Sequence, residues 1–231
     1  MRITFLGHSS FRIEIERAVF LIDPWLHQNP AFPKAQTEAA IEGVTHILLT
    51  HGHSDHIGDA LAIAAQKSVP IVGIVELVAW CQAHGGVDGL GFNKGGTVGL
   101  NGAKVTMVAA SHSSSITHEG ARLTAGAEVG FMIAGEGHTI YVSGDTDIMA
   151  DMEWMGDVHN PDIGILSAGG HYTMDMKRAA YAAKRYFNFK TVIPCHYKTF
   201  SVLEQSAKVL IKALPDVQVI EPEVMVPISF V

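Results

Sequence analysis

Cysteine is scarce in this chain, which contains only Cys81 and Cys195 among its 231 residues. Two cysteines cannot build the disulfide framework that stabilises small secreted domains, and they are typical of proteins in a reducing compartment. The first residues enter a strand pattern at once, without the apolar segment and the cleavage site of a signal peptide. We therefore expect a cytoplasmic protein.

Long apolar runs and an excess of positive charge are also missing. The most apolar stretch, residues 60–81, is interrupted by Gln66, Lys67, Pro70 and Glu76, so it cannot span a bilayer as one helix. Lysine and arginine number 16 against 23 acidic residues, and the net charge of -7 disfavours binding to a phosphate backbone. We expect a small-molecule substrate, no nucleic acid and no membrane partner, and a homo-oligomer is left open.

The chain is rich in apolar residues, because 48% of it is hydrophobic and only 17% is charged, which excludes a disordered protein. Its length suffices to bury a large core in a single domain, residues 1–231. Strand and helix patterns alternate in both halves, which predicts an α/β protein with two sheets sandwiched between helices. Strands are expected at residues 2–6, 11–15, 19–22, 45–49, 69–73, 104–110, 127–133, 139–143, 163–166, 191–194 and 217–220. Helices are expected at residues 57–66, 75–83, 175–187 and 202–214, and the glycine-dense residues 85–102 are expected to form loops and hairpin turns.

Histidine is abundant, with thirteen residues, and the densest group lies in THGHSDH, residues 50–56, directly after the apolar run 47–49. Imidazole nitrogens and carboxylate oxygens are ligands that Zn²⁺, Mn²⁺ and Fe²⁺ accept. Alternate side chains of extended backbone share a face, so His51 and His53 can converge on one ion. The following turn can present Asp55 and His56 to another ion. The pattern predicts a metal site at the end of a strand.

Four residues cannot complete two metal shells, so further ligands are expected at other strand ends. His112, Asp145 and His196 each follow a predicted strand. Taken singly, His112 could be a surface residue, Asp145 a turn former or helix cap, and His196 a buried core imidazole. Their joint placement behind strands favours metal ligands.

The order of these residues resembles that of the metallo-β-lactamase superfamily, from HGHSDH through the lone His112 and the Gly-Asp pair at Asp145 to the late His196. The resemblance covers nearly the whole chain and implies a four-layer αββα sandwich with a dinuclear site at the sheet edge. It implies that His51, His53 and His112 hold one metal ion, that Asp55, His56 and His196 hold the other, and that Asp145 bridges the two.

Four shorter motifs, GHSSFRIE, IDPWLHQNP, GGHYTM and PCHYKTF, look like those of a cytoplasmic subgroup of metal-dependent hydrolases related to L-ascorbate-6-phosphate lactonase. Zinc β-lactamases carry cysteine at the place comparable to Asp145, so hydrolysis of antibiotics is disfavoured. The resemblance gives the reaction class more firmly than the substrate.

A dinuclear site of this kind implies hydrolysis, because a water between two cations ionises near neutral pH and becomes a hydroxide nucleophile. We expect two divalent ions per chain, with zinc favoured over manganese or iron, and attack on an ester, lactone or phosphoester of a small anionic metabolite. Asp55 could be a ligand or the proton acceptor for the attacking water, and the ligand role is preferred. The alternatives are a nuclease of the same fold, an iron-dependent redox enzyme and a non-catalytic metal-binding protein.

Three more residues are candidates for supporting roles. Asp23 is expected to orient a ligand or the histidine loop through a hydrogen bond, although it could simply end a strand before Pro24. His8 and His171 lie in loops after predicted strands, so either could contact substrate or donate a proton to the leaving group. The alternative for His8 is a cap of a hairpin. Cys195, next to His196, is expected to point the other way and to be inert.

Overall fold

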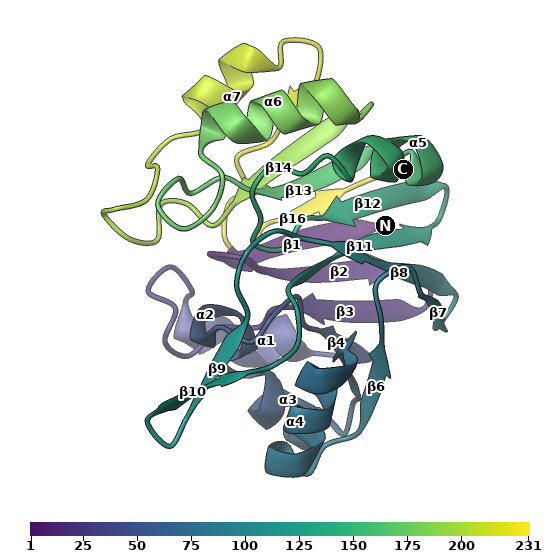
Figure 1. Ribbon diagram of the computed structural model, residues 1–231, viewed down its shortest axis with the longest axis vertical. Helices are drawn as coiled ribbons and strands as arrows, with labels where there is room; N and C mark the ends of the chain where they lie inside the picture. Colours follow the sequence, from purple (N-terminus) through teal and green to yellow (C-terminus); the bar gives the residue numbers. More distant parts are fainter.

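Two seven-stranded sheets lie face to face in the computed structural model, which describes all 231 residues (Figure 1). Helices cover the outer face of each sheet, α3 and α4 on one side of the molecule and α6 and α7 on the other. The predicted four-layer α/β sandwich is therefore confirmed. The apolar runs at residues 71–74, 163–167 and 191–195 form strands that are buried on both faces, between the partner sheet and a layer of helices.

The first sheet has the strand order β16-β1-β2-β3-β4-β5-β6. The pairs from β16 to β3 are antiparallel, whereas the pairs from β3 to β6 are parallel. The strands are β1 (Arg2–Gly7), β2 (Ser10–Ile15), β3 (Ala18–Ile22), β4 (His46–Leu48), β5 (Ile71–Ile74), β6 (Gly89–Phe92) and β16 (Pro227–Ser229).

The second sheet repeats this plan with the order β15-β14-β13-β12-β11-β8-β7. Strands β7, β8, β11 and β12 are antiparallel, and β12 to β15 are parallel. The strands are β7 (Thr97–Leu100), β8 (Ala103–Ala109), β11 (Val129–Gly135), β12 (His138–Val142), β13 (Ile163–Ser167), β14 (Thr191–Cys195) and β15 (Gln218–Val219).

The helices of each half connect the parallel strands of that half. The first half holds the 3₁₀ turn η1 (Lys34–Gln36) and helices α1 (Thr37–Ile41), α2 (Ser54–Ile57), α3 (Ala60–Lys67) and α4 (Val75–Gly85). The second half holds α5 (Met152–His159), α6 (Met176–Tyr186) and α7 (Lys208–Ala213). Asp175 caps the N-terminus of helix α6, and its side chain accepts a hydrogen bond of 2.8 Å from the backbone of Arg178. None of these helices has the length and the apolar content that a membrane span requires.

Two groups of buried apolar residues hold the layers together. The larger lies between the sheets and under helices α1, α3 and α4, and it includes Phe11, Phe20 and Phe131, which are fully buried. The smaller joins the second sheet to α5, α6 and α7 through residues such as Met155 and Ala179. Because both groups exclude water from the sheet faces, the edge where the strands end is left as the place for polar side chains.

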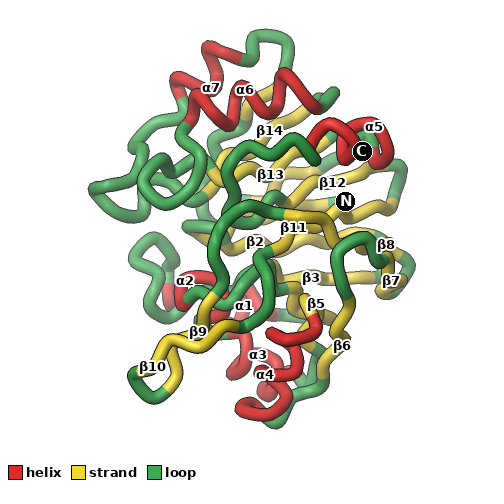
Figure 2. The backbone as a smooth tube through the Cα atoms, in the orientation of Figure 1, coloured by secondary structure: helices red, strands yellow, loops and turns green.

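One hairpin belongs to neither large sheet. Strands β9 (Ser115–His118) and β10 (Ala121–Thr124) pair only with each other, and Figure 2 shows the hairpin extending from the body as an arm. The sequence did not predict this hairpin or helix α5. Strands β6 and β7 lie in the glycine-dense segment where loops and hairpin turns were expected. Strand β7 does form a hairpin with β8, whereas the strands themselves were not predicted, because their glycines hide the apolar alternation of a strand.

The helix predicted over residues 202–214 is mostly wrong, because only Lys208–Ala213 is helical. The preceding residues form turns that the Gln205 side chain fixes by donating hydrogen bonds of 2.8 Å to the carbonyls of Phe200 and Leu203. The helix predicted over 57–66 is divided at Gly58 into α2 and α3. At this break, a Cβ on residue 58 would lie 2.5 Å from the Trp25 ring.

Candidate metal centre

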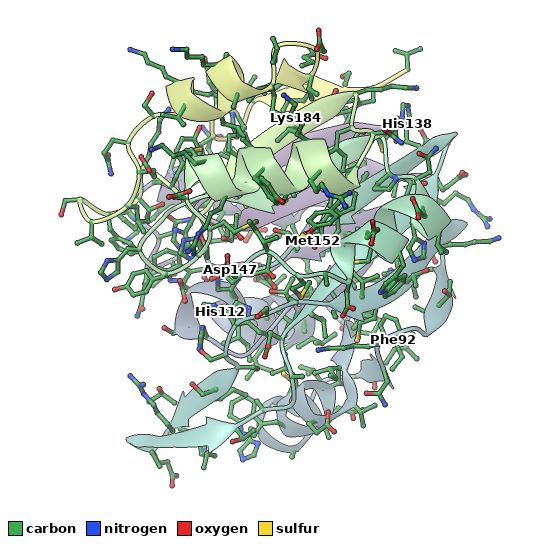
Figure 3. All side chains as sticks on the ribbon, turned by 45° about the horizontal axis from the view of Figure 1, so that its top comes forward. Phe92, His112, His138, Asp147, Met152 and Lys184 are labelled. Carbon is green, nitrogen blue, oxygen red and sulfur yellow. The ribbon has the colours of Figure 1, made fainter.

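The functional candidates gather at one edge of the sandwich because parallel strands deliver their carboxyl ends to the same side. Strands β1 and β3 are both antiparallel to β2, and β8 and β12 are both antiparallel to β11, so each pair points the same way. His8 follows β1, Asp23 follows β3, the HGHSDH loop follows β4, His112 follows β8, Asp145 follows β12 and His196 follows β14. Figure 3 labels His112 and Asp147, whose loops are joined by a hydrogen bond of 3.0 Å from the Asp147 amide to the Ser111 carbonyl.

The first group of potential ligands consists of His51, His53 and His112, whose ring nitrogens lie within 4.8 Å of one another. Nε2 of His51 lies 3.0 Å from Nδ1 of His53. Burial lowers the pKa of all three imidazoles below the ordinary value. They are therefore neutral near pH 7, which is the state that binds a metal ion.

The second group consists of Asp55, His56 and His196, and the structure adds His8 to it. Oδ2 of Asp55 lies 3.6 Å from Nε2 of His196 and 3.8 Å from Nε2 of His56. The His56 and His196 rings are buried, whereas Asp55 is half-buried and reaches the surface of a cavity.

Asp145 lies between the two groups. Its Oδ2 is 3.1 Å from Nε2 of His196, 3.4 Å from Nε2 of His56 and 3.6 Å from Nε2 of His112. This carboxylate is almost completely buried, and its Oδ1 has no hydrogen-bond partner. One carboxylate oxygen thus faces imidazoles from both groups.

A chain of hydrogen bonds orients two of the histidines. Oδ1 of Asp23 accepts from the Thr50 amide at 2.8 Å, and Oδ2 accepts from the Thr50 hydroxyl at 2.6 Å. That hydroxyl in turn accepts from Nδ1 of His51 at 3.0 Å, and Oδ2 of Asp23 also accepts from Nδ1 of His56 at 2.8 Å. Because both Nδ1 atoms donate, the Nε2 atoms of His51 and His56 are directed at the site. The position of Asp23 fits the predicted orienting role.

The charges of the second group are strongly coupled. Burial opposes the charged form of His56, but Asp145, Asp23 and Asp55 outweigh burial and raise its pKa well above the ordinary value. Burial opposes the charged form of His196 too, and Asp145 outweighs it and raises the pKa of His196 to about 9. Although burial disfavours the ionised carboxylates, the neighbouring histidines hold the pKa of Asp145 and that of Asp55 well below the usual range.

The donor set fits divalent cations. Nε2 of His56 and Oδ1 of Asp145 are buried without a hydrogen bond, which is costly for groups that bind nothing. The two carboxylates would offset part of the charge of such ions, and carboxylate oxygen with imidazole nitrogen is the donor combination that Zn²⁺ and similar cations accept.

Backbone geometry at the site is unusual in ways that fix the loops. His8, Asp23 and His196 have positive φ angles of 57°, 45° and 58°, a conformation that non-glycine residues rarely adopt. Gly144 has φ +59°, and a Cβ there would lie 2.7 Å from the Val129 carbonyl oxygen. The chain before Asp145 can therefore make this close approach only with glycine.

His8 is completely buried and does not line the cavity. Burial lowers its pKa to about 4, so the ring is neutral and carries one N–H. Its Nε2 donates to Oδ2 of Asp55 at 3.0 Å, and its Nδ1 accepts from the hydroxyl of Thr199 at 2.9 Å. The backbone carbonyl of His8 accepts from the amide of His196 at 2.7 Å. These contacts favour a residue that positions Asp55 and His196 over one that touches substrate.

Replacing His8 with Ala should lower the affinity for metal by about 10–100-fold, the usual cost of losing a partner that orients a ligand. His8→Gln should retain more affinity, because a glutamine amide can donate to Asp55 from a similar place. Metal titration followed by elemental analysis measures both effects. His171→Ala is the comparison, and a His8→Ala protein with wild-type metal affinity would contradict the positioning role.

A cavity of about 510 Å³ opens above the two groups of ligands. Its lining includes His53, Asp55, His112, Asp145 and His196, so both groups reach the same space. His171 is exposed and lines a different hollow, while its neighbour Tyr172 lines the cavity. The structure therefore does not bring His171 to the ligands, and its catalytic role stays a prediction.

The cavity residues that sequence reasoning did not single out include Trp25, Tyr172, Phe200 and Arg122. Three of them lie in the recognised motifs IDPWLHQNP, GGHYTM and PCHYKTF, so their position beside candidate histidines was the available signal. Arg122 lies on the unpredicted hairpin and gave no such signal. Cys195 is buried and burial raises its pKa well above the ordinary value, which agrees with an inert thiol.

The fold and the clustered His and Asp residues define a class of proteins. Residues 19–197 match the family described as the β-lactamase superfamily domain, and the chain belongs to this family. Within it, the chain belongs to the UPF0173 metal-dependent hydrolases, whose name gives its enzyme class. A relative of this name from Cereibacter sphaeroides is 67% identical, over 99% of this chain and 100% of its own.

Two further comparisons agree. A UPF0173 metal-dependent hydrolase of Paracoccus denitrificans is 67% identical over 99% of both chains. Among solved structures, Igni18, a metallo hydrolase from the archaeon Ignicoccus hospitalis, is 30% identical with a TM-score of 0.83, and the match covers 99% of this chain and 98% of Igni18. The predicted metal-dependent hydrolase of the metallo-β-lactamase superfamily is thus confirmed.

Proposed function

We propose that this enzyme hydrolyses an ester, lactone or phosphoester bond of a small anionic metabolite with two divalent cations in one site. The observation that carries the proposal is the position of Asp145, whose Oδ2 lies 3.1 to 3.6 Å from imidazole nitrogens of both ligand groups. Zinc is the proposed ion, with manganese or iron as alternatives, because the donors are imidazole and carboxylate.

Each cation has its own set of residues. His51, His53 and His112 would hold one, Asp55, His56 and His196 would hold the other, and Asp145 would reach both. When bound, such cations supply Lewis-acid chemistry, which makes water nucleophilic near neutral pH and polarises a carbonyl or phosphoryl oxygen.

The remaining residues of the chain prepare the site. Asp23 and Thr50 hold the rings of His51 and His56 with Nε2 toward the site, and His8 holds Asp55. Trp25, Tyr172 and Phe200 wall the cavity and reduce the access of bulk water to the reacting bond. The subgroup related to L-ascorbate-6-phosphate lactonase suggests phosphorylated or lactone substrates. The buried free cysteines fit a cytoplasmic location.

Protein purified without chelators should contain about two transition-metal ions per chain, because two complete ligand sets share Asp145. Elemental analysis with a matched protein assay gives the ratio. Chelation should remove hydrolysis of aryl esters or lactones, and adding zinc back should restore it. One ion per chain that does not increase after metal supplementation would overturn the dinuclear assignment.

A further inference from the structure

The hairpin β9–β10 has two different faces. In its register Arg122 is opposite Thr117, Leu123 is opposite Ile116, and Ala121 is opposite His118. Paired residues of antiparallel strands point to the same face, and successive residues alternate between faces. Thr117 and Arg122 therefore share one face, and Ile116 and Leu123 share the other.

The face of Ile116 fastens the hairpin to the body. Ile116 is only 3% exposed, and its Cγ1 packs against Gly52 so closely that a Cβ there would lie 2.7 Å away. His118 completes the attachment, because its ring lies 4.7 Å from that of His84 and 5.6 Å from that of Trp80, both on α4. The hairpin thus rests on the metal-binding loop at its base and on α4 farther along.

The opposite face lines the cavity. Ser115, Thr117 and Arg122 all contribute to its wall, and Arg122 is the one lysine or arginine in that wall. Among the six arginines of the chain, four are paired with acidic residues: Arg2 and Arg12 with Glu14, Arg178 with Asp147, and Arg185 with Glu153. Arg122 is exposed and makes no ion pair or hydrogen bond within the chain, so its guanidinium is free for a ligand.

The apolar part of the cavity wall is aromatic. Trp25 and Phe200 have ring centroids 6.1 Å apart, and the Tyr172 ring lies 6.4 Å from that of His196. Together with Tyr172 these rings are the hydrophobic lining of the cavity. A ligand that fills this space meets the candidate metal ligands, an aromatic wall and one unpaired guanidinium.

We propose that Arg122 determines specificity by binding an oxyanion of the substrate, a carboxylate or phosphate group away from the bond that is cleaved. The planar guanidinium can hold either group through two parallel N–H donors. Acidic residues outnumber basic ones in this chain of net charge -7, and yet Arg122 pairs with none of them and faces the candidate active site. The inference rests on the proposed hydrolase function and adds the residue that selects anionic substrates.

Two matched aryl esters test this assignment, the 4-nitrophenyl monoester of glutaric acid and 4-nitrophenyl valerate, which differ in the terminal carboxylate. Arg122→Ala should lower kcat/KM for the anionic ester by about 10- to 100-fold, the usual worth of hydrogen bonds to a charged group, and leave the neutral ester unchanged. Arg122→Lys should restore part of the loss, and all variants should carry equal metal. Arg17→Ala, which removes another unpaired exposed arginine from the opposite sheet edge, is the control.

A measurement of ligand affinity tests the role of Arg122 independently of the proposed hydrolysis. Calorimetry on metal-loaded protein should give glutarate a higher affinity than butyrate, and Arg122→Ala should abolish that difference. Replacing glutarate with 4-phosphonobutyrate shows whether a carboxylate or a phosphate-like group is preferred. If neither ester is cleaved but this difference is found, the proposed cleavage of carboxylic esters fails and the anion site stands. If Arg122→Ala affects both esters equally, or leaves the difference in binding intact, the role of Arg122 is overturned.

Discussion

Replacing Asp145 with Asn is expected to abolish hydrolysis and to lower metal content. The amide keeps the shape of the side chain but removes the negative charge beside the Nε2 atoms of His56, His112 and His196. Because Asp145 faces both ligand groups, the substitution should lower metal affinity by more than the about 10–100-fold that removal of an orienting partner costs. Steady-state rates and elemental analysis of the purified variant measure the two effects.

Asp147→Asn is the matched control, since Asp147 lies in the same loop but is exposed and pairs with Arg178 on the surface. Its activity and metal content should match those of the wild type. Circular dichroism of both variants should show an intact fold, because the buried strands of the core do not include these loops. An Asp145→Asn protein with near-wild-type turnover would exclude Asp145 from the site.

Zinc loading of metal-free protein near neutral pH should release about two protons per chain from histidines, because coordination requires neutral imidazole, and a metal-bound water that ionises should add about one more. The histidine protons should come from His56 and His196, whose pKa values are raised, the latter to about 9. His51, His53 and His112 have lowered pKa values and should release none. The ion at these three histidines should therefore bind with little pH dependence above pH 6.5, whereas affinity for the second ion should rise with pH to about 9.

Calorimetry in two buffers of different ionisation enthalpy counts the protons that accompany each binding step. His196→Gln should reduce the count by about one, since it removes one titrating imidazole. Equal proton release at both steps, or none at either, would contradict this division of the site.

The same pKa shifts affect the metal-free fold. The raised pKa of His196 contributes stability that is complete below 6.5, the ordinary value, and is lost as pH rises through about 9. The lowered pKa of Asp145 contributes stability above its ordinary value of 3.8 that is lost as pH falls well below it. Denaturant titrations of the metal-free protein should therefore give a free energy of unfolding that declines from pH 6.5 to 9.

The chain order of strands and the HGHSDH loop could be predicted from sequence because both are local patterns. The resemblance implied the grouping of His51 and His53 with the distant His112, and the structure brings their ring nitrogens within 4.8 Å of one another. The contact of His8 with Asp55 could not be predicted, because it depends on a left-handed backbone at His8 and on two loops meeting in space. Arg122 was missed for a related reason, since four-residue strands rich in polar residues carry little periodicity.

The proposed ligands come from both sheets of the sandwich: His51, His53, Asp55 and His56 follow β4 of the first, and His112, Asp145 and His196 follow strands of the second. Ions held here would link the two sheets at the edge of the sandwich that faces solvent. Their binding free energy would then favour the closed sandwich, by about 2.7 kcal/mol for an ion at 100 times its dissociation constant. The stability of the packing between the two sheets would then depend on the concentration of free metal in the cell. Metal depletion would therefore destabilise the enzyme as well as inactivate it.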